Sequence, residues 1–335
     1  MLNKKILCVL CASAVIIIIN GSPLLAAQKS FDPNASPEQF AQWQADTRVL
    51  LSEILFNGKP PAAVPFEAKF GKQETREGYT LTEVSFNDRP GHVTSGWIAR
   101  PLKPADAKLP LMIVCHGHSG TGYQTFDPKT IYYFGERFAQ KGYIVFAPDI
   151  GHETLEGLPS RISWGPFPKD VKFPFMGQRV WMVERGLDFM LTQPGVDPDK
   201  IGIAGLSNGG VTAMYAGALD PRIKLTIASG SLILHERMWH KELIHCRCQY
   251  LDKMEGVLDY YDVFALIAPR GLVVQNGFGD PIFPIKSAVT AFEFVKKAYQ
   301  IDNATDKVIH DTHDGKHEFR MEIPLGWANR FLPLP

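Results

Sequence analysis

The sequence of 335 residues predicts an α/β fold, a mostly parallel sheet with helices on both faces. Six short apolar runs lack the polar alternation of strands that keep one face in water, and helical stretches separate them as parallel crossovers require. Two alternating segments come before these runs and predict an antiparallel hairpin. The apolar runs lie at residues 111–115, 143–147, 201–204, 225–228, 272–275 and 307–310, and the hairpin strands at 79–86 and 92–99, joined by a turn at 87–91.

The composition is that of a folded domain with no strong charge preference. Hydrophobic residues make up 45% and charged residues 21% of the chain, values that exclude a disordered protein. Lysine plus arginine equals aspartate plus glutamate at 35 each, and no basic block stands out. Nucleic-acid binding needs a basic face, so we expect no nucleic-acid partner and a neutral or weakly charged substrate. The composition leaves the oligomeric state open.

Residues 1–27 differ in character from the rest and predict a signal peptide. Lys4 and Lys5 precede an apolar run at 6–19, and small residues follow up to a cleavage point near Ala26 or Ala27. The apolar run is too short to span a membrane comfortably. We therefore expect a single mature domain at 28–335 that is secreted or periplasmic in a bacterium, without a stable membrane span.

Three further segments organise this domain. Ser36 as N-cap and Pro37 at the first helical position predict a helix that ends before Gly58. Two connections, at about 151–177 and 229–269, are longer than the strand–helix pattern needs. Each follows a strand, and the carboxyl ends of parallel strands are where ligands bind in open α/β folds. We expect these insertions to form the walls of a substrate pocket.

Ser207 is the predicted nucleophile. It is the centre of the turn Gly205-Leu206-Ser207-Asn208-Gly209, which directly follows one apolar run and precedes a segment compatible with a helix. Strand, tight turn and helix form the context in which G-x-S-x-G exposes a reactive serine. The flanking glycines remove side chains that would collide in a sharp turn. The helix also directs its positive end at the reaction centre.

A serine hydroxyl needs a base to take its proton and a carboxylate to orient that base. Asp280 lies in a loop at the end of the run at 272–275, and His317 lies in a loop beyond the last strand. The chain order serine, acid, histidine is the one expected for this type of nucleophile turn. We predict that Ser207, Asp280 and His317 form the triad. The weaker candidates are Asp259 and Asp262 for the acid and His313 for the base.

Two backbone N–H groups are needed to stabilise the oxyanion that forms during acyl transfer. Asn208 follows the nucleophile and should supply one of them. The turn at 116–120, after the first parallel strand, should supply the other. Gly117 lets the chain turn closely there, so we select the N–H of His118, with Ser119 as the open alternative.

These motifs resemble those of the α/β-hydrolase superfamily over about residues 78–335. More narrowly, the segments 266–270 and 275–284 and the N-terminal helix are similar to a bacterial branch of dienelactone-hydrolase-like proteins and acetyl-xylan-esterase-like carbohydrate esterases. The resemblance implies an acyl-enzyme mechanism, a Ser-Asp-His triad and no cofactor. Dienelactone hydrolases use a cysteine nucleophile, whereas this chain has Ser207, which favours ordinary ester hydrolysis.

Cysteine usage argues against a disulfide framework, because three cysteines, an odd number, remain after the signal. They are Cys115, Cys246 and Cys248. His240 and His245 lie close to the last two, but this spacing matches no standard zinc finger. We predict no metal and interpret the segment as a packed insertion, with metal binding as the open alternative. Arg179 and Arg185 are interpreted as helix-surface residues rather than ligands for a substrate carboxylate.

The sequence therefore predicts a secreted serine carboxylesterase that acts through an acyl-enzyme. The aromatic residues of the insertions suit a small-molecule or polysaccharide ester, and the family resemblance implies either an acetyl ester or a methyl-esterified uronate as the substrate. Two alternatives stay open: a serine peptidase of the prolyl-oligopeptidase type, and a non-catalytic binding module that has kept the fold. The acyl group and the alcohol are not specified by the sequence.

Overall fold

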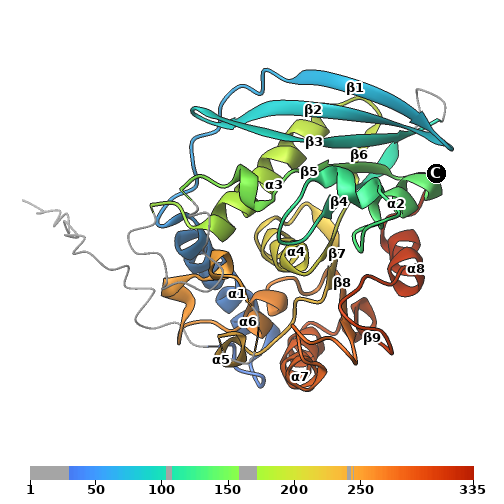
Figure 1. Ribbon diagram of the computed structural model, residues 1–335. Coiled ribbons are helices and arrows are strands. Elements are labelled where there is room, and N and C mark those ends of the chain that lie inside the picture. The colour runs from blue at the N-terminus through green and yellow to red at the C-terminus, as the bar shows by residue number, and fades with distance from the viewer. Residues whose placement is uncertain (1–29, 103–107, 158–171, 240–242, 244) are drawn as a thin grey trace, which may run out of the picture.

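The computed structural model describes residues 30–102, 108–157, 172–239, 243 and 245–335, so the predicted signal peptide lies outside the described residues. The described part contains a nine-stranded sheet in the order β1-β2-β3-β5-β4-β6-β7-β8-β9 (Figure 1). The strands β4, β5, β6, β7, β8 and β9 run parallel, and the antiparallel strands β1, β2 and β3 extend one edge. The predicted α/β class is confirmed. The strands are β1 (Lys69–Arg76), β2 (Tyr79–Arg89), β3 (His92–Pro101), β4 (Leu109–Cys115), β5 (Ile144–Pro148), β6 (Val196–Leu206), β7 (Ile223–Ser229), β8 (Gly271–Gly277) and β9 (Val308–His313).

Helices cover both faces of the parallel strands, which explains why these strands are apolar without alternation. In β4, Leu111 and Ile113 pack in a core beneath α3 and α4, whereas Met112 and Val114 pack in a core with α2 and α8. Every residue of β4, β5 and β8 is buried. The covering helices are α1 (Pro37–Phe56), α2 (Gly135–Lys141), α3 (Phe175–Leu191), α4 (Asn208–Leu219), α6 (Tyr260–Ala265), α7 (Ile285–Ile301) and α8 (Glu322–Phe331).

The N-terminal helix α1 begins as predicted. The Ser36 hydroxyl accepts a hydrogen bond from the Gln39 N–H at 3.3 Å, and the Gln39 side chain accepts one from the Ser36 N–H at 2.9 Å. This reciprocal capping box satisfies two N–H groups that a helix start leaves without partners. The helix ends at Asn57, whose left-handed backbone (φ 49°) stops it before Gly58.

The antiparallel edge differs from the prediction in two respects. Strand β1 has a mostly exposed, polar face, so its sequence carries no strand pattern. The predicted turn at 87–91 is too long, because β2 continues through Asp88 and Arg89. These two residues are buried and form an ion pair at 2.6 Å, Arg89 also pairs with Glu156 at 2.8 Å, and the Trp181 indole N–H donates to the Asp88 carbonyl at 3.1 Å. Buried pairing keeps this charged stretch in the sheet.

The parallel order brings the carboxyl ends of six strands to one edge of the sheet. The turn at 116–120 follows β4, the insertion at 151–177 follows β5, and the insertion at 229–269 follows β7. Residues 158–171, 240–242 and 244 of these insertions lie outside the described part. Among the helices that the structure describes, none has the length and apolar character needed to cross a membrane.

A carboxyl group in α3 gives the fold a pH dependence. Burial, and then the charges of Asp220 and Asp188, raise the pKa of Glu184 to about 8. In the unfolded chain this group ionises near its ordinary value of about 4.3, so the free energy of unfolding falls as pH rises between these two values. We expect E184Q to remove this loss. Urea denaturation gives the free energy of unfolding of E184Q and of the wild type at each pH. The value for E184Q minus the value for the wild type should be about 1–3 kcal/mol larger at about pH 8 than at about pH 5.

The exposed Glu293 of α7, paired with Lys296 at 3.2 Å, provides the control. For E293Q the difference from wild type should stay within about 0.5 kcal/mol at both pH values. An equal effect of E184Q at both pH values would show that the carboxyl is already ionised in the folded protein.

Candidate active site

Ser207 lies at the junction of β6 and α4 in a conformation that L-residues rarely adopt. Its backbone has φ 63° and ψ −128°, which costs on the order of 1–3 kcal/mol and persists only where the surroundings fix it. The Ser207 N–H donates to the Ser229 carbonyl of β7 at 2.9 Å, and the Ser207 carbonyl accepts from Val211 at 2.9 Å. A side chain at Gly209 would collide with the carbonyl oxygens of Cys115 and His116. The absence of that side chain lets α4 begin directly against the end of β4.

Asp280 and His317 form a hydrogen-bonded pair in which Asp280 is buried and His317 partly buried. The Nδ1 of His317 lies 2.7 Å from one carboxylate oxygen of Asp280. The other oxygen accepts hydrogen bonds from the N–H groups of Ile282 at 2.8 Å and Phe283 at 3.0 Å. Asp280 is only 6% exposed, so both its oxygens are fixed. The Nε2 of His317 is buried and has no hydrogen-bond partner among the described residues.

Gly230 connects this pair to the serine turn. It directly follows Ser229, the residue that binds the Ser207 N–H, and has a left-handed φ of 51°. A Cβ at Gly230 would lie 2.8 Å from Cε1 and 3.0 Å from Nδ1 of His317. The imidazole therefore lies directly on the end of β7, beside the strand residue that anchors Ser207. The structure brings Ser207, Asp280 and His317 to the same part of the sheet edge.

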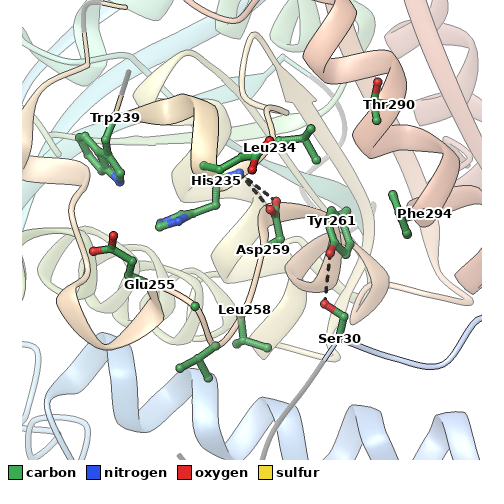
Figure 2. A pocket seen from close by; sticks show the side chains of 13 residues that line it. Ser30, Leu234, His235, Trp239, Glu255, Leu258, Asp259, Tyr261, Thr290 and Phe294 are labelled. Atoms are coloured by element: carbon green, nitrogen blue, oxygen red, sulfur yellow. Dashed lines mark hydrogen bonds between the residues drawn. The ribbon is translucent and has the colours of Figure 1, made fainter. Parts of the chain in front are cut away.

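The alternative acids have other partners. The Asp259 carboxylate caps α6 by accepting from the Tyr260 N–H at 2.6 Å, and both its oxygens accept from the His235 N–H at 3.0–3.1 Å (Figure 2). Asp262 accepts from the Asp259 N–H and from the Ser30 hydroxyl, each at 2.9 Å. Neither carboxylate has a hydrogen bond to a histidine side chain in the described part of the chain. The structure therefore gives both residues the geometry of helix caps.

The alternative histidines also lie outside the pair. His313 ends β9, and its Nδ1 accepts from the Gly315 N–H at 3.2 Å. His310 stacks on Phe292 and places its Nε2 3.1 Å from the Asn276 side-chain oxygen. Burial lowers the pKa of His310 to about 4. His317 is the histidine that the structure pairs with Asp280.

Arg179 of α3 contacts the turn after β4. Arg185 of the same helix is 7% exposed and Arg179 only 1%, which corrects the expectation that both lie on a helix surface. The Nη2 of Arg179 donates to the His118 carbonyl at 3.3 Å, while Nε and Nη1 have no partner among the described residues. The Nε2 of His116 accepts from the Ile150 N–H at 3.1 Å. Burial, with the charge of Arg179, lowers the pKa of His116 to about 3, so this side chain is neutral and fixed.

Asn208 is the first residue of α4, so its N–H has no acceptor within the helix. Its side chain is 1% exposed and donates through Nδ2 to the Cys248 sulfur at 3.4 Å. The Asn208 side chain therefore contacts the insertion at 229–269, whereas the Asn208 backbone is part of the serine turn. Ser119 follows His118 in the turn, and the backbone of His118 makes a hydrogen bond with the Tyr132 hydroxyl.

Two cavities lie along the insertion at 229–269. The larger, about 800 Å³, is lined by residues of the insertion and of α7 and contains no residue of the serine turn (Figure 2). The smaller, about 450 Å³, reaches Asp280. The insertion thus lines both cavities, and its part in a substrate pocket stays a prediction. Lining residues of the larger cavity include Leu234, Trp239, Leu258, Tyr261, Thr290 and Phe294.

A second group of reactive side chains lies beside the turn after β4. One ligand atom each from His118, His152, Cys246 and Cys248 falls within 4.8 Å of all the others. We call these four residues the thiol–imidazole cluster. The sequence interpretation grouped the two cysteines with neighbouring histidines instead, and therefore missed it. In the structure the His245 ring packs against Phe283 at 4.9 Å.

His240, which the sequence interpretation placed near the two cysteines, lies outside the described residues. The signal that could have revealed the cluster is topological. His118 and His152 follow β4 and β5, which are neighbouring parallel strands, so their loops meet at one edge of the sheet.

Comparisons with known proteins agree with the fold and the turn. Residues 164–245 match the family "Glucuronyl esterase, fungi". The hydrolase YtaP of Bacillus subtilis (strain 168) is 24% identical over 287 residues, 78% of this chain and 90% of that protein. The 4-O-methyl-glucuronoyl methylesterase 1 of Sodiomyces alcalophilus is 32% identical over 124 residues, 29% of this chain, and the match spans only 25% of that enzyme.

Among solved structures, a Bacteroides fragilis NCTC 9343 protein described as an acetyl xylan esterase superposes with a TM-score of 0.67 at 19% identity. The superposition covers 93% of this chain and 88% of that one, which shows that the fold is shared. The nine-stranded sheet, the serine turn between β6 and α4, and these relatives together identify the chain as a carboxylic ester hydrolase with the α/β-hydrolase fold.

Proposed function

We propose that this chain cleaves carbohydrate esters through an acyl-enzyme on Ser207. The observation that carries the proposal is the Asp280–His317 pair at 2.7 Å, which leaves Nε2 of His317 without a partner beside the strand end that anchors Ser207. A base with one fixed nitrogen and one available nitrogen is what a serine nucleophile requires.

In the proposed reaction, His317 takes the proton of the Ser207 hydroxyl through Nε2 as the oxygen attacks the ester carbonyl. Asp280 accepts from Nδ1–H and stabilises the imidazolium that forms. His317 then protonates the leaving alcohol and activates a water molecule, which releases the acid from Ser207. Because both oxygens of Asp280 are fixed by hydrogen bonds, the imidazole keeps its orientation through both steps.

The N–H groups of Asn208 and His118 are proposed to bind the oxyanion, with the neighbouring Ser119 as the alternative to His118. Asn208 contributes the free N–H of a helix start, where the helix dipole also favours negative charge. Arg179 supports this arrangement from behind, because its buried guanidinium binds the His118 carbonyl at 3.3 Å. A fixed positive charge in a buried position favours the developing negative charge in front of it.

For the substrate we propose a methyl-esterified uronate carried on a saccharide. The family match at 164–245 runs from the first insertion through the serine turn into the second, and the Sodiomyces relative acts, by name, on a 4-O-methyl-glucuronoyl ester. An acetyl ester is the competing carbohydrate substrate. The lysine pair and apolar run within residues 1–27 support export, to the periplasm or the medium, where such polymers are found.

The first prediction concerns the nucleophile. S207A should lower kcat for 4-nitrophenyl acetate hydrolysis by about 10⁴-fold or more, because no other group can form the acyl-enzyme. S85A in β2, at the antiparallel edge, should keep wild-type activity and serves as the control. Activity of S207A within about tenfold of wild type would exclude the acyl-enzyme on Ser207, and inactivity of the wild type towards all esters would favour a non-catalytic module.

The second prediction separates the candidate acids. D280N should lower kcat by about 10²–10⁴-fold, because the amide cannot stabilise an imidazolium and can favour the wrong tautomer. D259N is the matched control, since Asp259 caps α6 and accepts hydrogen bonds from the backbone N–H groups of Tyr260 and His235. It should lower stability by about 1 kcal/mol and leave kcat within about twofold. A larger kcat loss in D259N than in D280N would reverse the assignment.

The third prediction concerns the substrate. The methyl ester of a 4-O-methyl-glucuronoyl saccharide should be cleaved with a kcat/KM at least about tenfold above that for acetylated xylo-oligosaccharides. Methanol and acetate release, measured on the two substrates in parallel, check this directly. Preference for the acetylated substrate would assign an acetyl esterase instead, and cleavage of proline-containing peptide amides would favour the peptidase.

A further inference from the structure

We infer that the thiol–imidazole cluster of His118, His152, Cys246 and Cys248 is a binding site for one Zn²⁺ ion. The site is separate from Ser207, Asp280 and His317, so the inference does not rest on the proposed esterase activity. It departs from the sequence-based expectation that the chain holds no metal.

The spacing of the four ligand atoms fits tetrahedral zinc. Nε2 of His152 lies 3.3 Å from the Cys248 sulfur and 3.5 Å from the Cys246 sulfur, and all four atoms lie within 4.8 Å of one another. Zinc bonds of about 2.0–2.1 Å to nitrogen and about 2.3 Å to sulfur place tetrahedral N and S ligands roughly 3.5–3.6 Å apart. The cluster is thus close to the size of a filled site.

The burial of the cluster also points to a missing partner. Cys246 is 5% exposed and Cys248 is 0% exposed. Nε2 of His118 is buried without a hydrogen-bond partner among the described residues, although its ring lies edge-on to that of His152 at 4.1 Å. Leaving a buried polar nitrogen unpaired costs about 1–3 kcal/mol. A metal ion between the rings and the sulfurs would give this nitrogen a ligand bond.

Hydrogen-bond donors lie beside both sulfurs. The Asn208 Nδ2 donates to the Cys248 sulfur at 3.4 Å, and the Cys248 N–H donates to the Cys246 sulfur at 3.5 Å. Outer hydrogen bonds of this kind orient metal ligands and stabilise their charge. Two thiolates would also neutralise the two charges of the ion.

The types of ligand favour zinc, and the presence of four protein ligands favours a structural role. Two imidazoles with two thiolates suit a borderline-soft ion that prefers tetrahedral geometry. All four positions are filled by protein, so no open position is left for water or substrate. The ligands come from the loop after β4, the loop after β5 and the insertion at 229–269. Zinc would therefore hold the insertion against the turn that carries His118.

Metal analysis of the purified protein tests this inference. We expect about one zinc per chain by inductively coupled plasma mass spectrometry after dialysis against metal-free buffer. C246S and C248S should each reduce the retained zinc at least about tenfold. C115S is the matched control, because Cys115 is a buried cysteine of β4 outside the cluster and should leave the zinc content unchanged.

Cobalt substitution gives a second readout in the wild-type protein, which keeps the test valid if a cysteine variant does not fold. The cobalt form should show thiolate-to-metal charge-transfer bands and the visible bands of tetrahedral cobalt. A wild-type chain that binds neither ion with its thiols reduced would overturn the inference. A Cys246–Cys248 disulfide in the purified protein, found by mass spectrometry without reduction, would overturn it as well.

Discussion

The strained backbone at Ser207 is the constraint on which the site depends. With φ 63° and ψ −128°, this residue turns the chain from β6 into α4 without an intervening loop. The turn is maintained by the hydrogen bond from Ser207 to Ser229 and by the contact of Gly209 with the end of β4. A strain on the order of 1–3 kcal/mol is small beside the burial of α4 between the sheet and α3, so packing fixes a conformation that local preference disfavours.

The other site residues depend on the same edge. Because β4, β6, β7 and β8 are parallel neighbours, the loops that follow them meet beside the serine turn. Asp280 comes from the loop after β8, and His317 lies against Gly230 at the end of β7. Buried Arg179 binds the carbonyl of His118 in the loop after β4. The proposed zinc site shares His118 with that loop, so its metal content bears on how rigidly the proposed oxyanion donors are held.

Local patterns were sufficient to predict much of this molecule. The buried parallel strands, the cap at Ser36 and the pairing of Asp280 with His317 follow from apolar runs, capping chemistry and the chain order of a known motif. Strand β1 could not be predicted, because its exposed face has no apolar period. The burial of Arg179 and the thiol–imidazole cluster depend on tertiary packing; Cys246 and His152 are 94 positions apart. Only knowledge of how the insertion packs on the β4 and β5 loops would reveal them.

The most direct test of the account is the crystal structure of the protein inactivated by a fluorophosphonate. The account predicts one phosphonyl group on the Ser207 oxygen. Its phosphoryl oxygen should accept hydrogen bonds from the N–H groups of Asn208 and His118, with Nε2 of His317 beside the serine oxygen. Phosphonylation of another residue, or a phosphoryl oxygen that points away from both N–H groups, would contradict the account.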